Sequence, residues 1–188
     1  YGVVVLHGYY CSVQNGKKGE IVALPRGGTD TSGGHAAGEL GALVYENRSD
    51  NSIMRASPKV VQNPLKLDEI TYREALELTF MGFGILTDEA IRPCMNKLIP
   101  IHVIDDFNGS GITKILRYRK PDGYEVAGVA HKPGYVDMTI STASRDINSY
   151  VLQEALGIHK RRNIQIRTGN SSVSFVVPGD VFTDEFVN

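Results

Sequence analysis

The residues with the clearest chemical potential form one short stretch near the N-terminus, in which a cation, two glycines and a carboxylate follow one another. They are Arg26, Gly27, Gly28, Thr29 and Asp30. The planar guanidinium of Arg26 suits a carboxylate or a phosphate, while Asp30 suits a cation or a substrate ammonium group. The glycines allow a tight turn and a close approach of the backbone to a ligand. A guanidinium near a carboxylate is the arrangement that a zwitterion requires.

The elements on either side must position this stretch. An apolar strand, 20–24, runs into it, and a helix rich in glycine and alanine, about 32–42, follows it. We expect Thr29 or Asp30 to cap this helix, whose first N–H groups then point at a ligand over the turn. The alternative is an ordinary strand-to-helix turn. Taken alone, the five residues favour that alternative, because short motifs match by chance.

A second polar cluster follows the next predicted strand, 43–46. The segment 47–52 lies at the carboxyl end of that strand, where open α/β sheets bind ligands. Further on, Pro58 and Lys59 place a cation on a restrained loop that could reach a phosphate. An exposed, solvated lysine is the simpler interpretation of that pair.

Composition excludes several functional classes. The net charge of the 188 residues is -1, and no basic stripe occurs, which argues against a nucleic-acid-binding protein. Two cysteines, Cys11 and Cys94, make neither a disulfide framework nor a zinc site and fit a reducing cytoplasm. The five histidines are scattered, so we predict no metal site in the chain. No run is long and apolar enough for a membrane span, and we expect a cytoplasmic protein without membrane or nucleic-acid partners.

The pattern of the first part predicts an α/β fold with a mainly parallel sheet and helices on both faces. The apolar run 3–6 predicts a buried strand. Thr71 and Glu74 form a capping box that opens one helix, and Thr87 can cap a second. A β-branched strand at 100–104 follows.

The polar connection at 105–110 is the expected boundary between two domains, residues 1–110 and 111–188. The expected elements beyond it are strands at 112–118, 126–130 and 135–140, a helix at 147–161, and a hairpin of strands 164–167 and 173–177. This order is most of a ferredoxin-like βαββαβ unit. Because its last helix and strand are missing and the chain starts inside an apolar run, we expect a fragment of a longer polypeptide.

Taken together, these segments resemble aspartate kinase, a member of the amino acid kinase family, over essentially the whole chain. Residues 25–30 are similar to the family's arginine-glycine-glycine-serine-aspartate motif. Residues 45–50 resemble the strand end with the nucleotide motif, and 54–59 resemble the segment with a basic residue after a proline. Segments 69–78 and 99–103 are similar to the helix and strand that close the catalytic domain. The rest resembles most of a first ACT domain, a small-molecule-sensing module, in incomplete form.

The resemblance implies transfer of the γ-phosphoryl group of ATP to the β-carboxylate of L-aspartate, with ATP and Mg²⁺, in the pathway that leads to lysine. It implies that Arg26 binds the α-carboxylate of aspartate and that the four residues after it line the same pocket. The nucleotide-binding residues that it implies are Ser49, Asp50, Met54 and Lys59. Phosphoryl transfer depends mainly on positioning and charge neutralisation, which cations and backbone N–H groups supply.

The ACT-like unit implies feedback control by an amino acid such as lysine or threonine. Such a ligand binds between two ACT units, which makes a homodimer the expected assembly. The regulatory residues that the resemblance implies are Lys132, Pro133, Gly134, Tyr135, Ile147, Asn148 and Ser149.

The chain also departs from the family's pattern. Arg48 stands where an apolar residue is usual, Gly84 where lysine or asparagine is common, and Thr87 where histidine is common. The segment 50–53 is one residue short. Most of these positions belong to the nucleotide side, so the alternative function is a kinase-like regulatory or amino-acid-sensing protein with a degraded nucleotide site. An amino acid kinase for glutamate or a nucleotide is disfavoured by the ACT-like unit.

A phosphate-binding part is expected upstream of these residues. The family's N-terminal lysine and its glycine-rich phosphate loop do not occur in the 188 residues. We therefore expect these residues alone to lack kinase activity.

Overall fold

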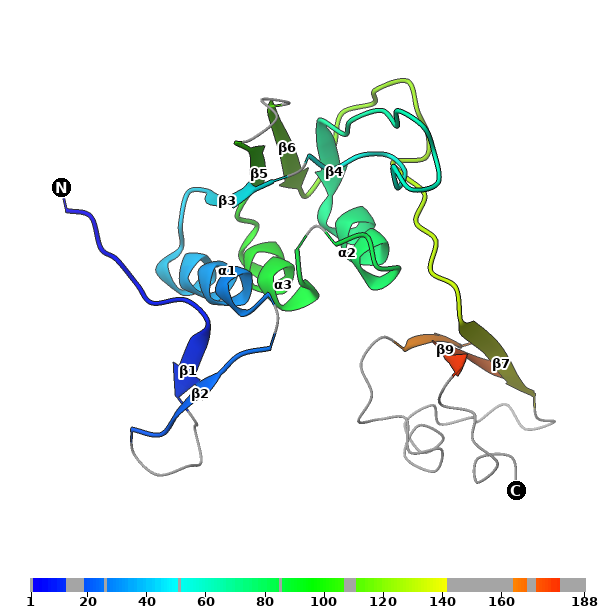
Figure 1. Ribbon diagram of the computed structural model, residues 1–188, viewed down its shortest axis with the longest axis horizontal. Coiled ribbons are helices and arrows are strands. Elements are labelled where there is room, and N and C mark those ends of the chain that lie inside the picture. The colour runs from blue at the N-terminus through cyan, green and yellow to red at the C-terminus, as the bar shows by residue number, and fades with distance from the viewer. Residues whose placement is uncertain are drawn as a thin grey trace. The chain divides into compact units, whose positions relative to one another are not determined.

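The computed structural model describes residues 2–12, 19–25, 27–50, 52–84, 86–106, 111–141, 164–168 and 172–179. The chain divides into two compact units, Tyr1–His131 and Lys132–Asn188 (Figure 1). In the described ranges, no helix has the length and apolar character to cross a membrane.

The first unit contains a mixed four-stranded sheet with the order β3-β5-β6-β4. The strands are β3 (Tyr45–Ser49), β4 (Glu69–Thr71), β5 (Ile101–Asp105) and β6 (Gly111–Leu116). β3 is parallel to β5, and β4 is parallel to β6, whereas β5 and β6 are antiparallel. The predicted α/β class is confirmed.

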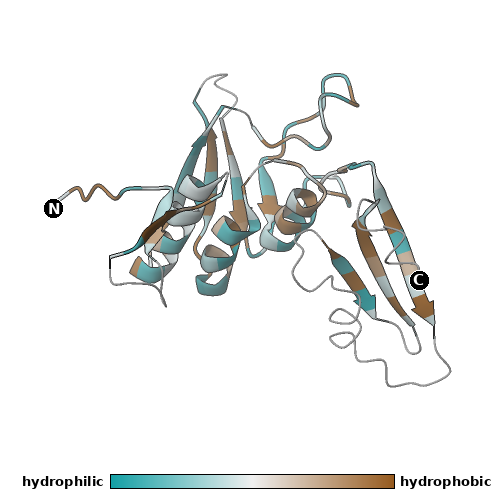
Figure 2. Cartoon of the chain, turned by 60° about the horizontal axis from the view of Figure 1, so that its bottom comes forward, coloured by the Kyte–Doolittle hydropathy of each residue, from teal (hydrophilic) through white to brown (hydrophobic). Residues whose placement is uncertain are grey.

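Three helices, α1 (Gly28–Leu40), α2 (Tyr72–Phe80) and α3 (Asp88–Lys97), cover one face of this sheet (Figures 1 and 2). The sequence predicted helices on both faces; among the described residues, all helices of the first unit lie on the same face. Alternate residues of a strand point to one side, and those facing the helices, such as Ile101, Val103 and Ile115, are fully or almost fully buried.

Helix α1 packs closely against α3 because it carries glycines where the two helices meet. A Cβ atom on Gly34 would lie 2.2 Å from the carbonyl oxygen of Ala90, and one on Gly38 would lie 3.0 Å from Cβ of Pro93. The buried Cys94 thiol donates to the Gly34 carbonyl at 3.7 Å, and burial raises the pKa of this thiol. Glycine weakens an isolated helix, but here it permits an approach that alanine would prevent.

The predicted starts of α2 and α3 are confirmed. Thr71 Oγ1 accepts a hydrogen bond from the Glu74 amide at 3.2 Å, and the Glu74 carboxylate accepts one from the Thr71 amide at 2.8 Å. These two bonds form the capping box. Thr87 Oγ1 accepts from the Ala90 amide at 3.3 Å.

The predicted cap of α1 was wrong. This helix begins at Gly28, and Gly27 is its N-cap with a φ of 84°. Thr29 and Asp30 therefore lie in the first helical turn. Gly27 adopts the left-handed conformation, which costs glycine little, and the helix therefore begins one to two residues before the predicted caps. Asp30 instead places a negative charge in the first turn, which the helix dipole favours.

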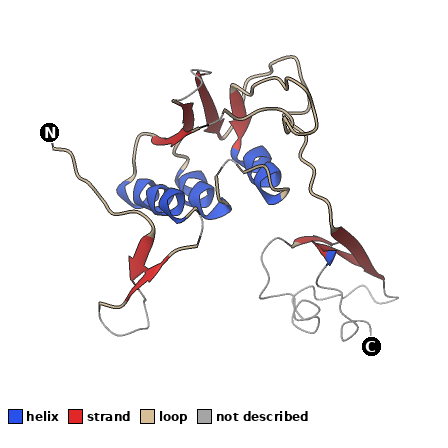
Figure 3. Ribbon diagram, in the orientation of Figure 1, coloured by secondary structure: helices blue, strands red, loops and turns tan. Residues whose placement is uncertain are grey.

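Two predicted strands did not form. Residues 3–6 belong to no strand, and Val3, Val4 and Val5 are 94%, 81% and 89% exposed. Figure 3 shows this N-terminal segment as loop. The next strands along the chain, β1 (Tyr10–Ser12) and β2 (Ile21–Ala23), pair with each other in a two-stranded sheet. Residues 126–130 form a single bridge, between Ala56 and Val129, because the segment follows the loop that begins at residue 54.

The division between the units lies later than the predicted boundary at 110. β6 pairs with both β5 and β4 and thus completes the sheet of the first unit. The segment 117–131 stays with the same unit, where Ala127 is buried and the Val129 amide donates to the Arg55 carbonyl at 2.7 Å. Adjacent antiparallel strands require only a short connection, so the antiparallel pairing of β5 with β6 keeps both strands in one unit.

The second unit contains an antiparallel sheet with the order β7-β9-β8. Its strands are β7 (Tyr135–Ser141), β8 (Gln165–Thr168) and β9 (Ser172–Pro178). β7 and β8 both run antiparallel to β9 and hence parallel to each other, as do the first two strands of a ferredoxin-like unit on either side of the third. The predicted strands at 135–140, 164–167 and 173–177 are confirmed. The predicted helix at 147–161 lies outside the described residues.

Candidate functional site

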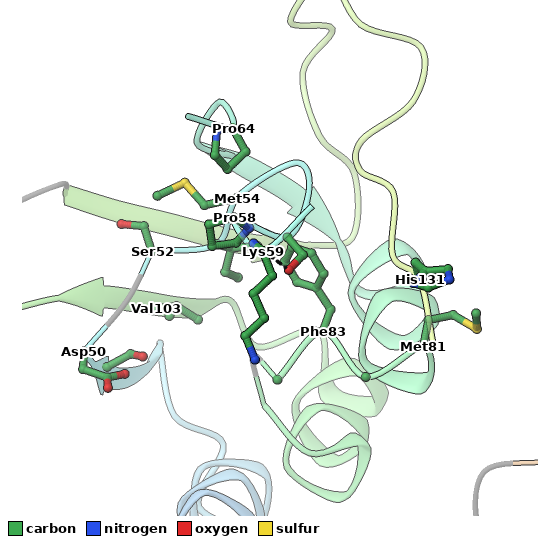
Figure 4. A pocket seen from close by; sticks show the side chains of 15 residues that line it. Asp50, Ser52, Met54, Pro58, Lys59, Pro64, Met81, Phe83, Val103 and His131 are labelled. Atoms are coloured by element: carbon green, nitrogen blue, oxygen red, sulfur yellow. Dashed lines mark hydrogen bonds between the residues drawn. The ribbon is translucent and has the colours of Figure 1, made fainter. Parts of the chain in front are cut away.

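A pocket of about 800 Å³ lies at the carboxyl end of β3, beside β5 (Figure 4). Its walls come from the end of β3 and the loop after it, from the segment that follows α2, and from residue 131. The structure brings four of the residues predicted from the sequence into this one pocket. They are Ser49, Asp50, Met54 and Lys59. The carboxyl ends of parallel strands are where α/β sheets bind ligands.

Lys59 supplies a cation to this pocket, and Figure 4 shows its side chain extended into the space. The loop that carries it is tightly turned. The Lys59 amide donates to Ser57 Oγ at 3.3 Å, and the Val60 amide donates to the Ser57 carbonyl at 2.9 Å. Pro58 fixes its own φ angle and restricts the residue before it, so the base of the lysine side chain has a defined position.

A buried carboxylate that the sequence did not single out lies next to this pocket. Asp105 ends β5, opposite Ser49 on β3, and is 5% exposed. Its Oδ2 accepts a hydrogen bond from Ser52 Oγ at 3.3 Å, and Ser52 lines the pocket. The available signal was an aspartate directly after a β-branched strand, but it was grouped with the polar connection that follows.

The turn before α1 forms a second candidate site. Arg26 lies outside the described residues, and the structure places the other four predicted residues around the start of the helix. A Cβ on Gly27 would lie 2.5 Å from Thr87 Cγ2, and one on Gly28 would lie 2.5 Å from Leu24 Cβ. Both glycines are therefore required by these contacts, and Gly27 is also required by its left-handed φ of 84°.

Asp30 is held in place from β3. Asn47 Nδ2 donates to Asp30 Oδ1 at 3.0 Å, and the Tyr45 hydroxyl donates to the Asp30 carbonyl at 3.2 Å. Burial raises the pKa of Tyr45, and hydrogen bonding to Asn47 opposes this only in part, so the phenol remains a donor. The partnership of Asn47 with Asp30 was not predicted, although alternation along the strand puts 45, 47 and 49 on one face.

β3 connects the two candidate sites. Asn47 binds the carboxylate of the α1 turn, while Ser49, two residues further along the same face, lines the pocket. Arg48 points to the opposite face and forms an ion pair with Asp106, with Nη1–O distances of 2.8 and 2.9 Å. A ligand in the pocket and a ligand over the α1 turn would thus share one strand as their common wall.

The remaining departures from the family pattern fall in different places. Gly84 lines the pocket, and a Cβ there would meet nothing within 4 Å. Thr87 belongs to the α1 turn, because its hydroxyl lies 3.1 Å from Thr31 Oγ1 as well as capping α3. In the described part of the chain, no group of three or more histidine, cysteine, aspartate or glutamate side chains could hold a metal ion.

In the second unit, the predicted regulatory residues at 132–135 lie at the start of β7. Lys132 Nζ lies 5.1 Å from the centre of the Tyr135 ring. Gly134 has a φ of 81°, and its carbonyl accepts a hydrogen bond from the Gly179 amide at 2.7 Å. Ile147, Asn148 and Ser149 lie outside the described residues.

The architecture of the first unit, with a ligand pocket at strand ends and a glycine turn ahead of α1, agrees with a match to a known family. The model of the amino acid kinase family matches residues 2–105. The chain belongs to the amino acid kinase family. Within that family, the similar proteins are aspartokinases, as the order of motifs in the sequence indicated.

Three of these relatives illustrate the similarity. Aspartokinase 3 of Bacillus subtilis is 29% identical over 85% of this chain and 34% of its own length. The aspartokinase of Mycobacterium tuberculosis is 32% identical over 73% of this chain and 33% of its own. The crystal structure of Escherichia coli aspartokinase III in complex with aspartate and ADP has a TM-score of 0.67 at 25% identity, covering 96% of this chain and 42% of that one. The chain thus spans about a third of the curated relatives' length.

Proposed function

We propose that this chain is part of an aspartate kinase, which transfers the γ-phosphoryl group of ATP to the β-carboxylate of L-aspartate. The observation that carries the proposal is the shared wall formed by β3. Asn47 on this strand holds Asp30 of the glycine turn, and Ser49 on the same face lines the pocket that contains Lys59. An amino-acid site and a nucleotide site on one strand face is the arrangement that transfer between two bound ligands needs.

The pocket is the nucleotide site in this proposal. Its volume of about 800 Å³ is in the range of cofactor pockets. Lys59 would neutralise phosphate charge, and Ser49 and Met54 would contact the nucleotide. The Mg²⁺ that accompanies ATP is bound by the phosphates of the nucleotide, and proteins usually contribute one or two carboxylate ligands to it. Asp50 and Asp105, in and beside the pocket, fit that requirement.

The α1 turn is the amino-acid site. Arg26 would bind the α-carboxylate of aspartate through two parallel hydrogen bonds from its guanidinium. Asp30 would stabilise a positively charged group at the site, such as the substrate ammonium. Thr29 and the two glycines would line the same pocket. The similarity to an aspartokinase whose structure contains aspartate and ADP supports both assignments.

The second unit would be an ACT-like regulatory domain. Its β7-β9-β8 order is that of the first three strands of a ferredoxin-like unit. Residues 132–135 would form part of a site for a regulatory amino acid, lysine or threonine, at a contact between two copies of the chain. In this proposal the protein is a cytoplasmic homodimer, and binding of the regulatory amino acid controls its activity in the pathway that leads to lysine.

A matched pair of substitutions in the full-length protein tests the two site assignments. We expect Lys59→Met to weaken binding of Mg·ADP about tenfold, a loss of about 1.4 kcal/mol, with aspartate affinity within twofold. Arg26→Lys should do the reverse, because lysine keeps the charge but loses the fork. Calorimetry measures both affinities. Lys114→Met, at an exposed position on β6, serves as the control.

The second candidate function, an amino-acid sensor of kinase descent, is favoured by Gly84, which leaves open space in the pocket wall where a larger side chain is common in the family. The same calorimetric experiment separates the two functions. Wild-type protein that binds aspartate but not Mg·ADP would establish the sensor and contradict the kinase. Residues 1–188 alone are expected to show no aspartate-dependent release of ADP, because the family's glycine-rich phosphate loop does not occur in them.

A further inference from the structure

One arginine side chain holds the loop of Lys59 from outside the pocket. Met54 and Lys66 form a β-bridge, so residues 54–66 make a closed loop, part of which lines the pocket. Arg55, the next residue, is not among the lining residues. Its amide donates to the Leu65 carbonyl at 2.8 Å, which ties the two ends of the loop together.

The side chain of Arg55 reaches residues 117–131, the last segment of the first unit. Its guanidinium carbon lies 4.2 Å from the centre of the Tyr124 ring. The same group forms an ion pair with Asp122 and donates to the carbonyl oxygens of Val126 and Ala127 at 3.3 and 3.2 Å. The side chain is only 15% exposed. Lysine cannot reproduce this combination of stacking, charge and several donors.

Backbone contacts join the same two segments. The Val129 amide donates to the Arg55 carbonyl at 2.7 Å, and Ala56 forms a parallel bridge with Val129. A Cβ on Gly128 would lie 2.9 Å from the Arg55 carbonyl oxygen. The segment 117–131 therefore lies directly against the start of the pocket loop.

Arg119 anchors this segment at its other end. Its Nε donates to the two carboxylate oxygens of Glu74 at 3.0 and 3.2 Å, and its Nη1 lies 3.4 Å from Asp122 Oδ1. The Arg55 guanidinium holds the pKa of the Asp122 carboxyl below its ordinary value. Because both arginines share Asp122, and Glu74 caps α2, the helix, the segment and the loop form one charged network.

The segment ends in the pocket wall. His131 lines the pocket, and Lys132 is the first residue of the second unit. The chain thus leads from the pocket to the second unit through residues that Arg55 fastens to the Lys59 loop. The α1 turn is held differently, by α3 and β3.

We propose that Arg55 is a positioning residue. It sets the position of Lys59 by fastening residues 54–66 to residues 117–131, and it makes the pocket loop follow any displacement of the segment that leads to the second unit. The proposal rests on the proposed function only in taking a nucleotide as the occupant of the pocket. It predicts that changes in this segment alter nucleotide binding while leaving the amino-acid site in place.

The test uses Arg55→Lys and Asp122→Asn in the full-length protein, with Arg92→Lys as the matched control. Arg92 makes an exposed ion pair with Asp88 on α3, at 3.3 Å. Backbone hydrogen exchange and calorimetry with Mg·ADP and L-aspartate are measured for each. We expect both test variants to speed exchange in 54–66 and 117–131 about tenfold and to weaken Mg·ADP binding about tenfold. Aspartate affinity should stay within about twofold, and the control should change neither quantity.

Exchange in 54–66 that remains at the wild-type rate in both variants would overturn the proposal. An acceleration spread evenly over α1, α3 and the loop would overturn it as well, since that is a loss of global stability. Wild-type protein that fails to bind Mg·ADP would contradict the proposed function instead, and the exchange rates would still decide the role of Arg55. If Arg55→Lys does not fold, Asp122→Asn decides by the same exchange criterion, because it removes one partner and leaves the stacking on Tyr124.

Discussion

The two candidate sites of the first unit are built in different ways. The α1 turn is fixed by close contacts that glycines make possible, with Gly27 against Thr87 and Gly34 against the backbone of Ala90. The pocket at the end of β3 is formed largely by loops, and its Lys59 loop is fastened by the side chains of Arg55 and Asp122. The α1 turn depends mainly on packing, with Asn47 and Tyr45 hydrogen-bonded to Asp30, whereas the pocket loop depends on polar side chains.

This difference bears on how each site can change. Close-packed backbones have few alternative arrangements, so the backbone of the α1 turn is expected to lose its geometry when the helices separate. A loop held by charged and stacked side chains can shift when one partner moves. Each hydrogen bond lost in this way has a modest free-energy cost, so ligand affinity at the loop can change gradually. The sensitivity of the molecule to substitution should therefore follow this division.

The largest effect is expected at the contact between α1 and α3. In Gly34→Ala, the new Cβ would lie 2.2 Å from a backbone oxygen of Ala90, and the two helices must move apart. Alanine is the better helix former, by about 1 kcal/mol, but overpacking costs about 3 kcal/mol here. We expect urea denaturation of the full-length protein to show a lower midpoint and both ligand affinities to fall.

Gly33→Ala provides the matched control one residue earlier. Its Cβ would meet only the end of the Tyr45 side chain, at 2.8 Å from the hydroxyl oxygen. Since a ring can tilt and the helix gains about 1 kcal/mol from alanine, the midpoint should change little. Equal destabilisation by the two substitutions would contradict the view that the close contact of Gly34 with the Ala90 backbone limits side-chain size at that position.

The next effect is expected at Asn47, which links β3 to the α1 turn. Asn47→Asp replaces the donor to Asp30 by an oxygen and places two carboxylates about 3 Å apart. Like charges at that distance raise the pKa of one of them. We expect aspartate affinity at neutral pH to fall about tenfold and to recover partly in mild acid, where one carboxyl is protonated and can donate. Titrations with aspartate at several pH values provide the measurement.

Asn47→Ala separates charge from lost hydrogen bonding in that experiment. It removes the donor without adding a carboxylate, so its effect should be smaller and independent of pH. An equal loss of Mg·ADP and aspartate binding in Asn47→Asp would mean that the strand is distorted as a whole, against the division between the two sites.

A smaller effect is expected in the network that holds the pocket. Burial raises the pKa of Glu74, but hydrogen bonds from Thr71 and Arg119 outweigh it, and the net pKa is lowered in the folded state. A carboxyl with a lowered folded-state pKa stabilises the fold above its unfolded pKa, and this contribution is lost as pH falls through the folded value. Glu74→Gln should thus cost about 1 kcal/mol at pH 7 and progressively less as pH falls from 7 through the folded-state pKa.

Thermal unfolding of wild type and Glu74→Gln across this pH range measures the difference. A cost that stays constant down to acid would assign it to packing instead of charge. At neutral pH, weaker binding of Mg·ADP than of aspartate in this variant would further support the view that the network serves the pocket.

Features formed by residues close together in the sequence could be predicted, and features formed by residues far apart in the sequence could not. The caps at Thr71 and Thr87 are local, since donor and acceptor are three residues apart, and they were predicted. The bond between Asn47 and Asp30 spans 17 residues, and the ion pair of Arg55 with Asp122 spans 67. Both depend on how segments that are distant in the sequence pack against each other, β3 on α1 in one case and two loops in the other, and local residue patterns do not determine such packing. The N-cap at Gly27 was missed for a related reason, because a positive φ leaves no mark beyond the glycine itself.

The pocket residues were found through the order of motifs, and the domain boundary was not. Ser49, Asp50, Met54 and Lys59 belong to segments whose sequence order resembles a known family, and the structure brings them together. The boundary at 131 depends on β6 pairing back on β5 and on residues 117–131 packing against Arg55. Polar residues at 105–110 are equally typical of a hairpin turn and of a linker.

The smallest effect is expected at Arg48, which lies on β3 between Asn47 and Ser49. Its ion pair with Asp106 is exposed, with 64% and 38% of the two side chains accessible, and such solvent-screened pairs contribute little to stability. The side chain also points away from the face that carries both sites. Arg48→Ala should therefore leave the unfolding midpoint and both affinities within experimental error. If the substitution instead strengthened Mg·ADP binding, the arginine would be acting on the pocket through β3, and the polar site would be more closely coupled to the strand than its loops suggest.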